Sequence, residues 1–302
     1  MSFSTEWKKF RPVFHGVEKL SAVFPRCGKR SCGFSTLWKT FFHAVENPRA
    51  APGRMGGAGF SLLELLAALA GIVLLAALLI GTLPAARAAA EAATCRSNLR
   101  QLATANLAYA ADHGRYVAAA ADIASNNAVR WHGMRVGSTF DGARGPLAEY
   151  LGGGEGSAWV RRCPAFRTDG TGFEAACGGY GYNALGLGSE ACLPGTGVKT
   201  ECGMRPGAVA HPAETVMFAD TAYLQGSGTK AKLIEYSFAE PPRFADGSTP
   251  WPTIHFRHRG KANVAWADGH VTSETLSRTG ARGAAQHLGW FGPDDNTWFD
   301  PF

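Results

Sequence analysis

The feature that most constrains this chain is an apolar run from Leu62 to Leu83 that contains a single charge, Glu64. Its 22 residues would form a helix of about 33 Å at about 1.5 Å per residue, enough to cross a hydrocarbon core of about 30 Å. An ionised carboxylate in hydrocarbon costs several kcal/mol, which marks Glu64 as a functional residue. The run therefore predicts one membrane-spanning helix that carries an acid in need of a partner.

Charge is distributed unevenly about this run. Residues 1–59 hold ten Lys or Arg residues and three acids, so the formal net charge of +6 originates before the run. A basic flank stays cytoplasmic and the opposite flank is exported, which predicts a single-pass protein with an exported head. The remainder is near neutral and has no basic stripe to bind phosphates, so we expect no nucleic-acid partner.

Two ordinary interpretations of the run are open. It is longer than the apolar region of most secretory signal peptides, although "ARA" at Ala86–Ala88 has the form of a cleavage site. A plain membrane anchor explains the length but leaves Glu64 without a partner.

A third interpretation comes from "GFSLLE", residues 59–64, which resembles the processing site of type IV prepilins and type II secretion pseudopilins. The resemblance implies that a prepilin peptidase cleaves after Gly59 and N-methylates Phe60, and that the apolar helix is retained in the bacterial inner membrane. It also implies that Glu64 pairs with the terminal amine of a neighbouring pilin-like subunit during assembly. Residues 1–59 would then be a leader, longer than is usual in that family.

The leader contains a repeat, "FSTEWKKFRPVFHGVE" at 3–18 and "FSTLWKTFFHAVE" at 34–46. These amphipathic segments could lie on a membrane surface. The alternative, which we favour, is that translation starts at Met55 and that the repeat is not part of the protein.

After the apolar segment at 60–83, an alanine-rich amphipathic continuation of the helix is predicted over 84–114, with a bend at Pro84 and an end at Gly114. One stripe on it recurs at steps of three and four residues: Cys95, Leu99, Leu102, Asn106, Tyr109 and Ala110. Residues 115–302 form the predicted head, with strands at 158–163, 214–220, 232–238, 253–258 and 262–276. We expect an α+β, pilin-like fold in which an antiparallel sheet packs on the long helix.

The last predicted strand pair is a hairpin with a two-residue turn at Asp268-Gly269 and a return that begins at Val271. Together with His258 it resembles the His-x(9)-Asp-Gly signature of a C-terminal domain found with prepilin-type N-termini. Further positions and segments share this resemblance: Arg257, Gly260, Asn263, His270, "CRSNLRQL" (95–102), "RCPA" (162–165), "YGYN" (180–183) and "FADT" (218–221). This second resemblance implies an architecture rather than an activity.

Chemistry-bearing residues in the head allow several interpretations. His258, Asp268 and His270 could form a metal set with Asp220. We favour a structural role in which His258 bonds the turn carboxylate, and we predict no enzyme activity because nucleophile-elbow, phosphate-loop and HExxH motifs are not found. The C-terminal segment offers oxygen ligands for calcium, but we favour a solvated tail; its candidate ligands are Asp294, Asp295, Asn296 and Asp300.

Seven cysteines divide between the leader, with Cys27 and Cys32, and the exported part. An exported head would meet an oxidising compartment, where disulfides persist. The five candidates for bridges are Cys95, Cys163, Cys177, Cys192 and Cys202. A bridge between Cys95 and Cys163 would join the helix to the sheet, and two of the other three could close the Gly-rich loop; five reduced thiols are the alternative.

The sequence thus predicts a structural subunit, a pseudopilin or minor pilin of a type II secretion or type IV pilus-like system. The alternative is a membrane-tethered protein whose head binds a polysaccharide or other ligand. Four tryptophans could serve there as sugar platforms or could equally be core residues: Trp131, Trp251, Trp290 and Trp298. A third hypothesis is a metal-dependent hydrolase that uses His258 and Asp268.

Overall fold

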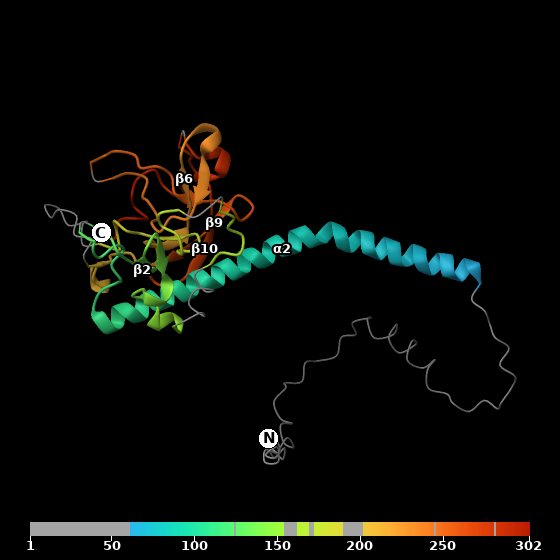
Figure 1. Cartoon of the computed structure of the whole chain (residues 1–302), viewed down its shortest axis with the longest axis horizontal. Coiled ribbons are helices and arrows are strands. Elements are labelled where there is room, and N and C mark those ends of the chain that lie inside the picture. Colours follow the sequence, from blue (N-terminus) through green and yellow to red (C-terminus); the bar gives the residue numbers. More distant parts are fainter. Residues whose placement is uncertain are drawn as a thin grey trace, which may run out of the picture. The chain divides into compact units, whose positions relative to one another are not determined.

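The computed structural model describes residues 61–123, 125–153, 162–168, 172–189, 202–244, 246–280 and 282–302. The chain divides into two compact units, Met1–Leu65 and Leu66–Phe302. The first is described only from Ser61 onward, so the predicted leader and the cleavage site at Gly59 and Phe60 lie outside the described residues. The second contains most of the long helix and the head (Figure 1).

The long helix α2 spans Leu62–His113 and continues through Pro84. Its alanine-rich composition favours this conformation, because alanine has the highest intrinsic helix propensity. It ends where Gly114 adopts a φ of +71°, a left-handed conformation that glycine takes without steric cost. The predicted continuous helix and its end at Gly114 are confirmed.

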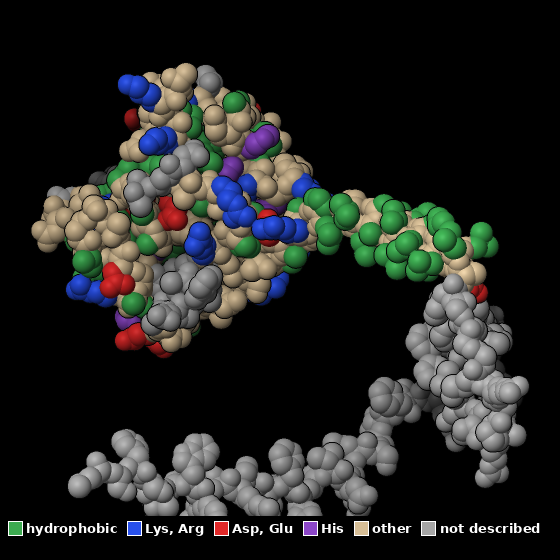
Figure 2. Space-filling view, turned by 45° about the vertical axis from the view of Figure 1, so that its right-hand side comes forward, with side chains coloured by type: hydrophobic (Ala, Val, Ile, Leu, Met, Phe, Trp, Pro, Cys, Tyr) green, Lys and Arg blue, Asp and Glu red, His purple; other side chains and the backbone are tan. Residues whose placement is uncertain are grey.

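The two parts of α2 meet different surroundings. Every side chain from Leu62 to Leu83 is exposed, and hydrophobic groups cover this part of the helix in Figure 2. By length and composition α2 is the one described helix able to span a membrane. In the second part, Cys95, Leu99 and Leu102 are fully buried, which confirms the predicted stripe.

The head is built from antiparallel strand pairs, so the fold is α+β as predicted. The main sheet has the order β10-β9-β5-β4, and three smaller sheets surround it. The main-sheet strands are β4 (Tyr180–Tyr182), β5 (Val216–Asp220), β9 (Lys261–Trp266) and β10 (Val271–Thr275). The others are β1 (Val129–Arg130), β2 (Gly133–Val136), β3 (Thr139–Asp141), β6 (Tyr223–Gln225), β7 (Lys232–Ile234), β8 (Ile254–His255) and β11 (Leu288–Gly289). Short 3-10 helices span Gly142–Arg144, Glu149–Leu151, Pro206–Ala208, Gly228–Lys230 and Ala284–Gln286.

The main sheet is covered on both faces, which is why every residue of β5 is buried. Phe218 belongs to the core shared with Leu99 and Leu102 of α2. Val216 and Ala219 belong to a second core on the other face, formed with aromatic residues of the C-terminal region. A β-bulge between Val216 and Phe218 interrupts the register with β9.

The predicted strands within 214–220, 232–238, 253–258 and 262–276 are confirmed, although most are shorter than the predicted ranges. The prediction at 158–163 falls mostly outside the described residues, and its described part, Arg162 and Cys163, is not in a strand. The strands before β5, β1 to β4, were not predicted. Each has only two to four residues, too few to show an alternation of apolar and polar side chains.

The hairpin between β9 and β10 is confirmed, but its predicted two-residue turn is wrong. Trp266 donates its N–H to the carbonyl of His270 at 3.0 Å, and the next pair is Ala265 with Val271. Three residues therefore form the loop: Ala267, Asp268 and Gly269. Gly269 has a φ of +94°, as expected for a left-handed residue that closes a three-residue loop.

The expected solvated tail is also wrong, because the C-terminal segment closes the second core. Phe299 is only 3% exposed, and its carbonyl accepts a hydrogen bond from the buried Asn183 amide at 2.8 Å. Val216 of β5 donates its N–H to the carbonyl of Trp298 at 2.7 Å. The prediction was based on the polar composition of this segment. The aromatic residues that lie between its aspartates pack on the second core and hold the segment there.

We expect Phe299→Ala to lower the free energy of unfolding by about 3–5 kcal/mol, the usual cost of truncating a buried phenylalanine. Phe302→Ala is the matched control, since Phe302 is 50% exposed and should change stability by less than about 0.5 kcal/mol. Urea unfolding of the full chain in detergent measures both variants. Equal effects would contradict a packed C-terminal segment.

Candidate functional site

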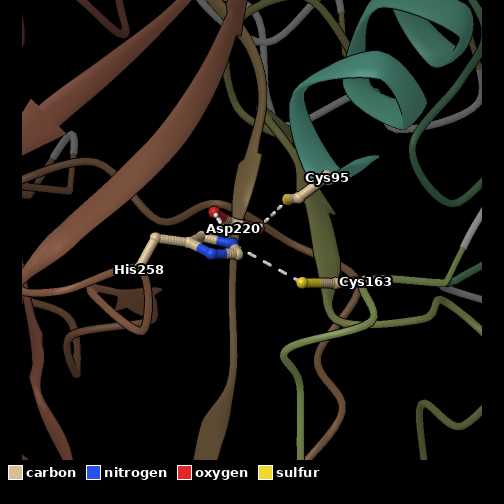
Figure 3. A group of neighbouring side chains, drawn as sticks. All are labelled: Cys95, Cys163, Asp220 and His258. Atoms are coloured by element: carbon tan, nitrogen blue, oxygen red, sulfur yellow. Dashed lines mark hydrogen bonds and ion pairs between the residues drawn. The ribbon is translucent and has the colours of Figure 1, made fainter. Parts of the chain in front are cut away.

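The candidate site is a buried group of four side chains, here called the Cys-Asp-His cluster: Cys95, Cys163, Asp220 and His258. Figure 3 shows that they come from four separate segments and point toward one another. Cys95, Cys163 and Asp220 have no exposed surface, and His258 is 8% exposed. The cluster therefore exists only in the folded head.

Packing of α2 on the main sheet brings Cys95 to Asp220. Cys95 lies one helical turn before Leu99 in the buried stripe. Asp220 ends β5 two residues after Phe218, so both residues lie on the same face of the strand. Leu99 and Phe218 share one core, to which Cys95 and Cys163 also belong.

Two loops supply the other members. His258 exchanges backbone hydrogen bonds with Lys261 at 3.0 and 3.2 Å, around a two-residue turn formed by Arg259 and Gly260. Both turn residues have positive φ, +55° and +77°, as the tightest hairpin turns require. This turn holds His258 just before β9. Cys163 enters the cluster from the loop before β4.

The contacts within the cluster are short. The Cys95 thiol donates to Asp220 Oδ1 at 3.0 Å, and His258 Nε2 lies 3.2 Å from Asp220 Oδ2. Cys163 Sγ lies 3.6 Å from His258 Nε2. All four potential ligand atoms fall within 4.8 Å of one another. The side chains thus surround a common centre.

Arg257 and Asn263 complete the surroundings of the Asp220 carboxylate. The Arg257 guanidinium donates to Asp220 Oδ1 at 2.7 Å and to Cys163 Sγ at 3.3 Å. The backbone N–H of Asn263 donates to Asp220 Oδ2 at 2.7 Å. Arg257 and Asp220 therefore form a buried ion pair, which is strongly destabilised when one partner is removed.

These contacts shift the pKa values of the cluster. Burial alone would raise the pKa of Asp220, but the charge of Arg257 and the contact with His258 hold it at about 2. Burial alone would lower the pKa of His258, but Asp220 raises it to about 9. Burial raises the pKa of the Cys95 thiol, whereas the proximity of Cys95 and the charge of Arg257 lower the pKa of Cys163.

The geometry differs from that of a catalytic Cys-His-Asp triad. In a triad the acid holds one imidazole nitrogen while the other takes the proton of the nucleophile. Here Asp220 and Cys163 both contact Nε2 of His258, so the ring cannot relay a proton between them. Two sulfurs, one carboxylate and one imidazole are instead ligand types that zinc takes in proteins.

The predicted bridge between Cys95 and Cys163 is not formed, and Cys177 is also a free thiol. Cys192 lies outside the described residues, so a bridge in the Gly-rich loop that includes it stays a prediction. Cys95 and Cys163 do meet between helix and sheet, as expected for a bridge there, but each sulfur is directed at another partner.

The hairpin signature separates in space. His258 lies at the start of β9 and Asp268 beyond its end, about 20 Å apart at about 3.3 Å per residue. The expected bond between His258 and the turn carboxylate is therefore wrong. Asp268 instead accepts from the backbone N–H of His270 at 2.9 Å and contacts its ring at 2.6 Å. The predicted set therefore separates into two pairs, His258 with Asp220 and Asp268 with His270.

The candidate calcium ligands do not converge. Asp294 pairs with Arg278, and Asp295 accepts from the backbone N–H of Thr297 at 3.0 Å. Asp300 accepts from the backbone N–H of Phe302 at 3.1 Å. Within the described residues, the only group of three or more potential His, Cys, Asp or Glu ligands is the Cys-Asp-His cluster.

Glu64 has a local role that the sequence reasoning missed. Its carboxylate accepts from the backbone N–H of Ser61 at 3.0 Å, and its own N–H donates to Ser61 Oγ at 3.2 Å. This reciprocal pair is a capping box at the start of α2. The Ser-x-x-Glu pattern at residues 61–64 was its sequence signal.

The tryptophans divide between core and surface. Trp131 and Trp290 are buried, whereas Trp251 is 49% exposed. Trp251 stacks on Tyr223 with ring centroids 5.5 Å apart, and the Arg282 guanidinium lies 4.0 Å from its ring centre. Trp251 borders an open groove of about 300 Å³.

Comparisons with protein-family models, curated proteins and solved structures find no match for this chain. The two resemblances, at residues 59–64 and 258–269, therefore stay predictions.

Asp220→Asn should lower the free energy of unfolding by about 3–5 kcal/mol, because Arg257 would remain buried beside a neutral group. Asp268→Asn is the control: its side chain is 37% exposed, and we expect a change below about 0.5 kcal/mol. Both are measured by urea unfolding of the full chain. A larger loss for Asp268→Asn would show that the turn acid, rather than the cluster acid, stabilises the head.

Proposed function

We propose that this protein is a pilin-like structural subunit, a pseudopilin or minor pilin of a type II secretion or type IV pilus-like system. It would be processed by a prepilin peptidase after Gly59, methylated at Phe60, and anchored in the inner membrane with its head exported. Other pilin-like subunits would be its partners, and assembly would use the N-terminal part of α2.

The observation that carries this proposal is the continuity of α2. Its first 22 residues, Leu62–Leu83, are apolar and pack against nothing in the described chain, while its second part forms the core of the head. No loop separates the two parts. A tether gains nothing from this rigid connection, but a subunit that polymerises through its helix needs the head held in a defined orientation.

The distribution of charge fits a membrane span at this part of the helix. From Leu65 to Ala86 the chain has no charged residue, and Arg87 is the first charge on the head side. Glu64 lies at the opposite end, close to the proposed new terminus at Phe60. In the proposed filament this exposed carboxylate would meet the terminal ammonium of a neighbouring chain, which would stabilise association within lipid.

A second candidate function is a membrane-tethered receptor for a polysaccharide. The groove beside Trp251 favours it, since Tyr223 and Tyr236 add aromatic surface and Glu240 adds a carboxylate. Against it, the Trp251 ring already contacts both Tyr223 and Arg282.

Mass spectrometry of the N-terminal peptide from native membranes tests processing. We expect a terminus at a methylated Phe60. A terminus at Ala89 would indicate an ordinary secreted head, and an uncut leader would indicate a simple tether; either result would contradict the proposal.

Three substitutions separate the proposed assembly role of Glu64 from its capping role. Glu64→Gln keeps the capping box but removes the charge, whereas Ser61→Ala removes the box, at a cost of about 1 kcal/mol, and keeps the charge. We expect cross-linked multimers in membranes to be lost in Glu64→Gln and Glu64→Ala but retained in Ser61→Ala, with export unchanged in all three. Loss only in Ser61→Ala and Glu64→Ala would reduce Glu64 to a helix cap.

A further inference from the structure

The Cys-Asp-His cluster is not part of the proposed assembly through α2, which does not explain why four potential metal-ligand atoms meet inside the head. Four potential ligand atoms from four segments meet inside the head, all within 4.8 Å of one another (Figure 3). A disulfide would join only Cys95 and Cys163 and would leave Asp220 and His258 buried beside it. A catalytic triad is excluded by the shared use of His258 Nε2.

We propose that the cluster is a structural zinc site, with Cys95 Sγ, Cys163 Sγ, an Asp220 carboxylate oxygen and His258 Nε2 as its four ligands. Structural zinc is four-coordinate and tetrahedral, with bonds of about 2.0–2.3 Å. Such bonds place ligand atoms about 3.3–3.8 Å apart. The Cys95–Asp220 contact of 3.0 Å and the Cys163–His258 contact of 3.6 Å lie near this range, and the widest pairs, at up to 4.8 Å, would have to close by about 1 Å.

The choice of metal follows from the ligand types. Thiolate ligands select borderline and soft ions, and carboxylate-rich or carbonyl-rich sites suit calcium and magnesium. Two sulfurs with one imidazole and one carboxylate therefore favour zinc over the hard cations. All four positions are protein ligands and the site is buried, which is the closed arrangement of a structural rather than a catalytic zinc.

The charges balance when the ion is bound. Two thiolates and one carboxylate carry three negative charges, so Zn²⁺ leaves one, and the guanidinium of Arg257 neutralises it. Arg257 already donates to both Asp220 and Cys163, and the Asn263 N–H holds the second carboxylate oxygen. Such outer contacts orient zinc ligands. Binding releases the thiol protons, and the proton of His258 Nε2, to solvent.

The four ligands come from segments far apart in the chain, at residues 95, 163, 220 and 258. A single ion would link α2, the loop before β4, β5 and the turn before β9. It would hold the head on the helix that carries it.

The test uses the full chain, purified in detergent with a non-thiol reductant. We expect about one zinc per chain by mass-spectrometric metal analysis, falling to near zero in Cys163→Ser and His258→Gln. The controls are Cys202→Ser and His270→Gln, which remove the same groups outside the cluster and should retain the metal. Chelation should lower the melting temperature of the wild-type protein, and added zinc should restore it.

Cobalt(II) substitution of the wild-type chain gives a readout that does not depend on variant folding. We expect a thiolate-to-cobalt charge-transfer band and the intense visible bands of a tetrahedral ion. Failure of the reduced protein to bind zinc or cobalt would overturn the proposal. A Cys95–Cys163 disulfide in metal-free protein from native membranes would overturn it as well. None of these results depends on filament assembly.

Discussion

Packing of the second part of α2 on the main sheet is the interaction on which the rest of the structure depends. Leu99 and Leu102 share one buried core with Phe218, and Cys95 and Cys163 of the cluster belong to the same core. Because the sheet is also covered on its other face, β5 is buried along its whole length. A charged residue at the end of such a strand, Asp220, cannot reach water and must find partners within the head.

Asp220 explains much of the surrounding sequence. Its carboxylate accepts hydrogen bonds from the Arg257 guanidinium, the Asn263 N–H and the Cys95 thiol. It also contacts the His258 ring. Each partner satisfies part of a charge that would otherwise cost several kcal/mol to bury. The spacing between His258 and Asp268 also acquires a physical meaning: β9 and its two turns span it, so the histidine serves the cluster while the Asp-Gly pair closes the hairpin at the other end.

Glu64 has a local role in the single chain and a second role in the proposed assembly. In the single chain its carboxylate caps the first turn of α2 through Ser61, which satisfies backbone groups that the helix leaves open. The side chain is nevertheless exposed, at the end of an apolar surface that has no partner in the described chain. That surface requires lipid or other helices, and the proposed filament would supply both.

The sequence by itself determined the local features. The length of the apolar run, the change to an amphipathic stripe after Pro84, the end at Gly114 and the β9–β10 hairpin are all written in residues close to one another, where periodicity and turn chemistry can be read directly. Only the tertiary structure decided the cluster, because Cys95 and Asp220 are 125 residues apart and Cys163 and His258 are 95 apart. It likewise turned the expected solvated tail into part of the core, since burial of Phe299 depends on the far face of a sheet formed elsewhere in the chain. Spacing along a chain does not report which faces meet, and that is settled by how the helix and the sheet cover one another.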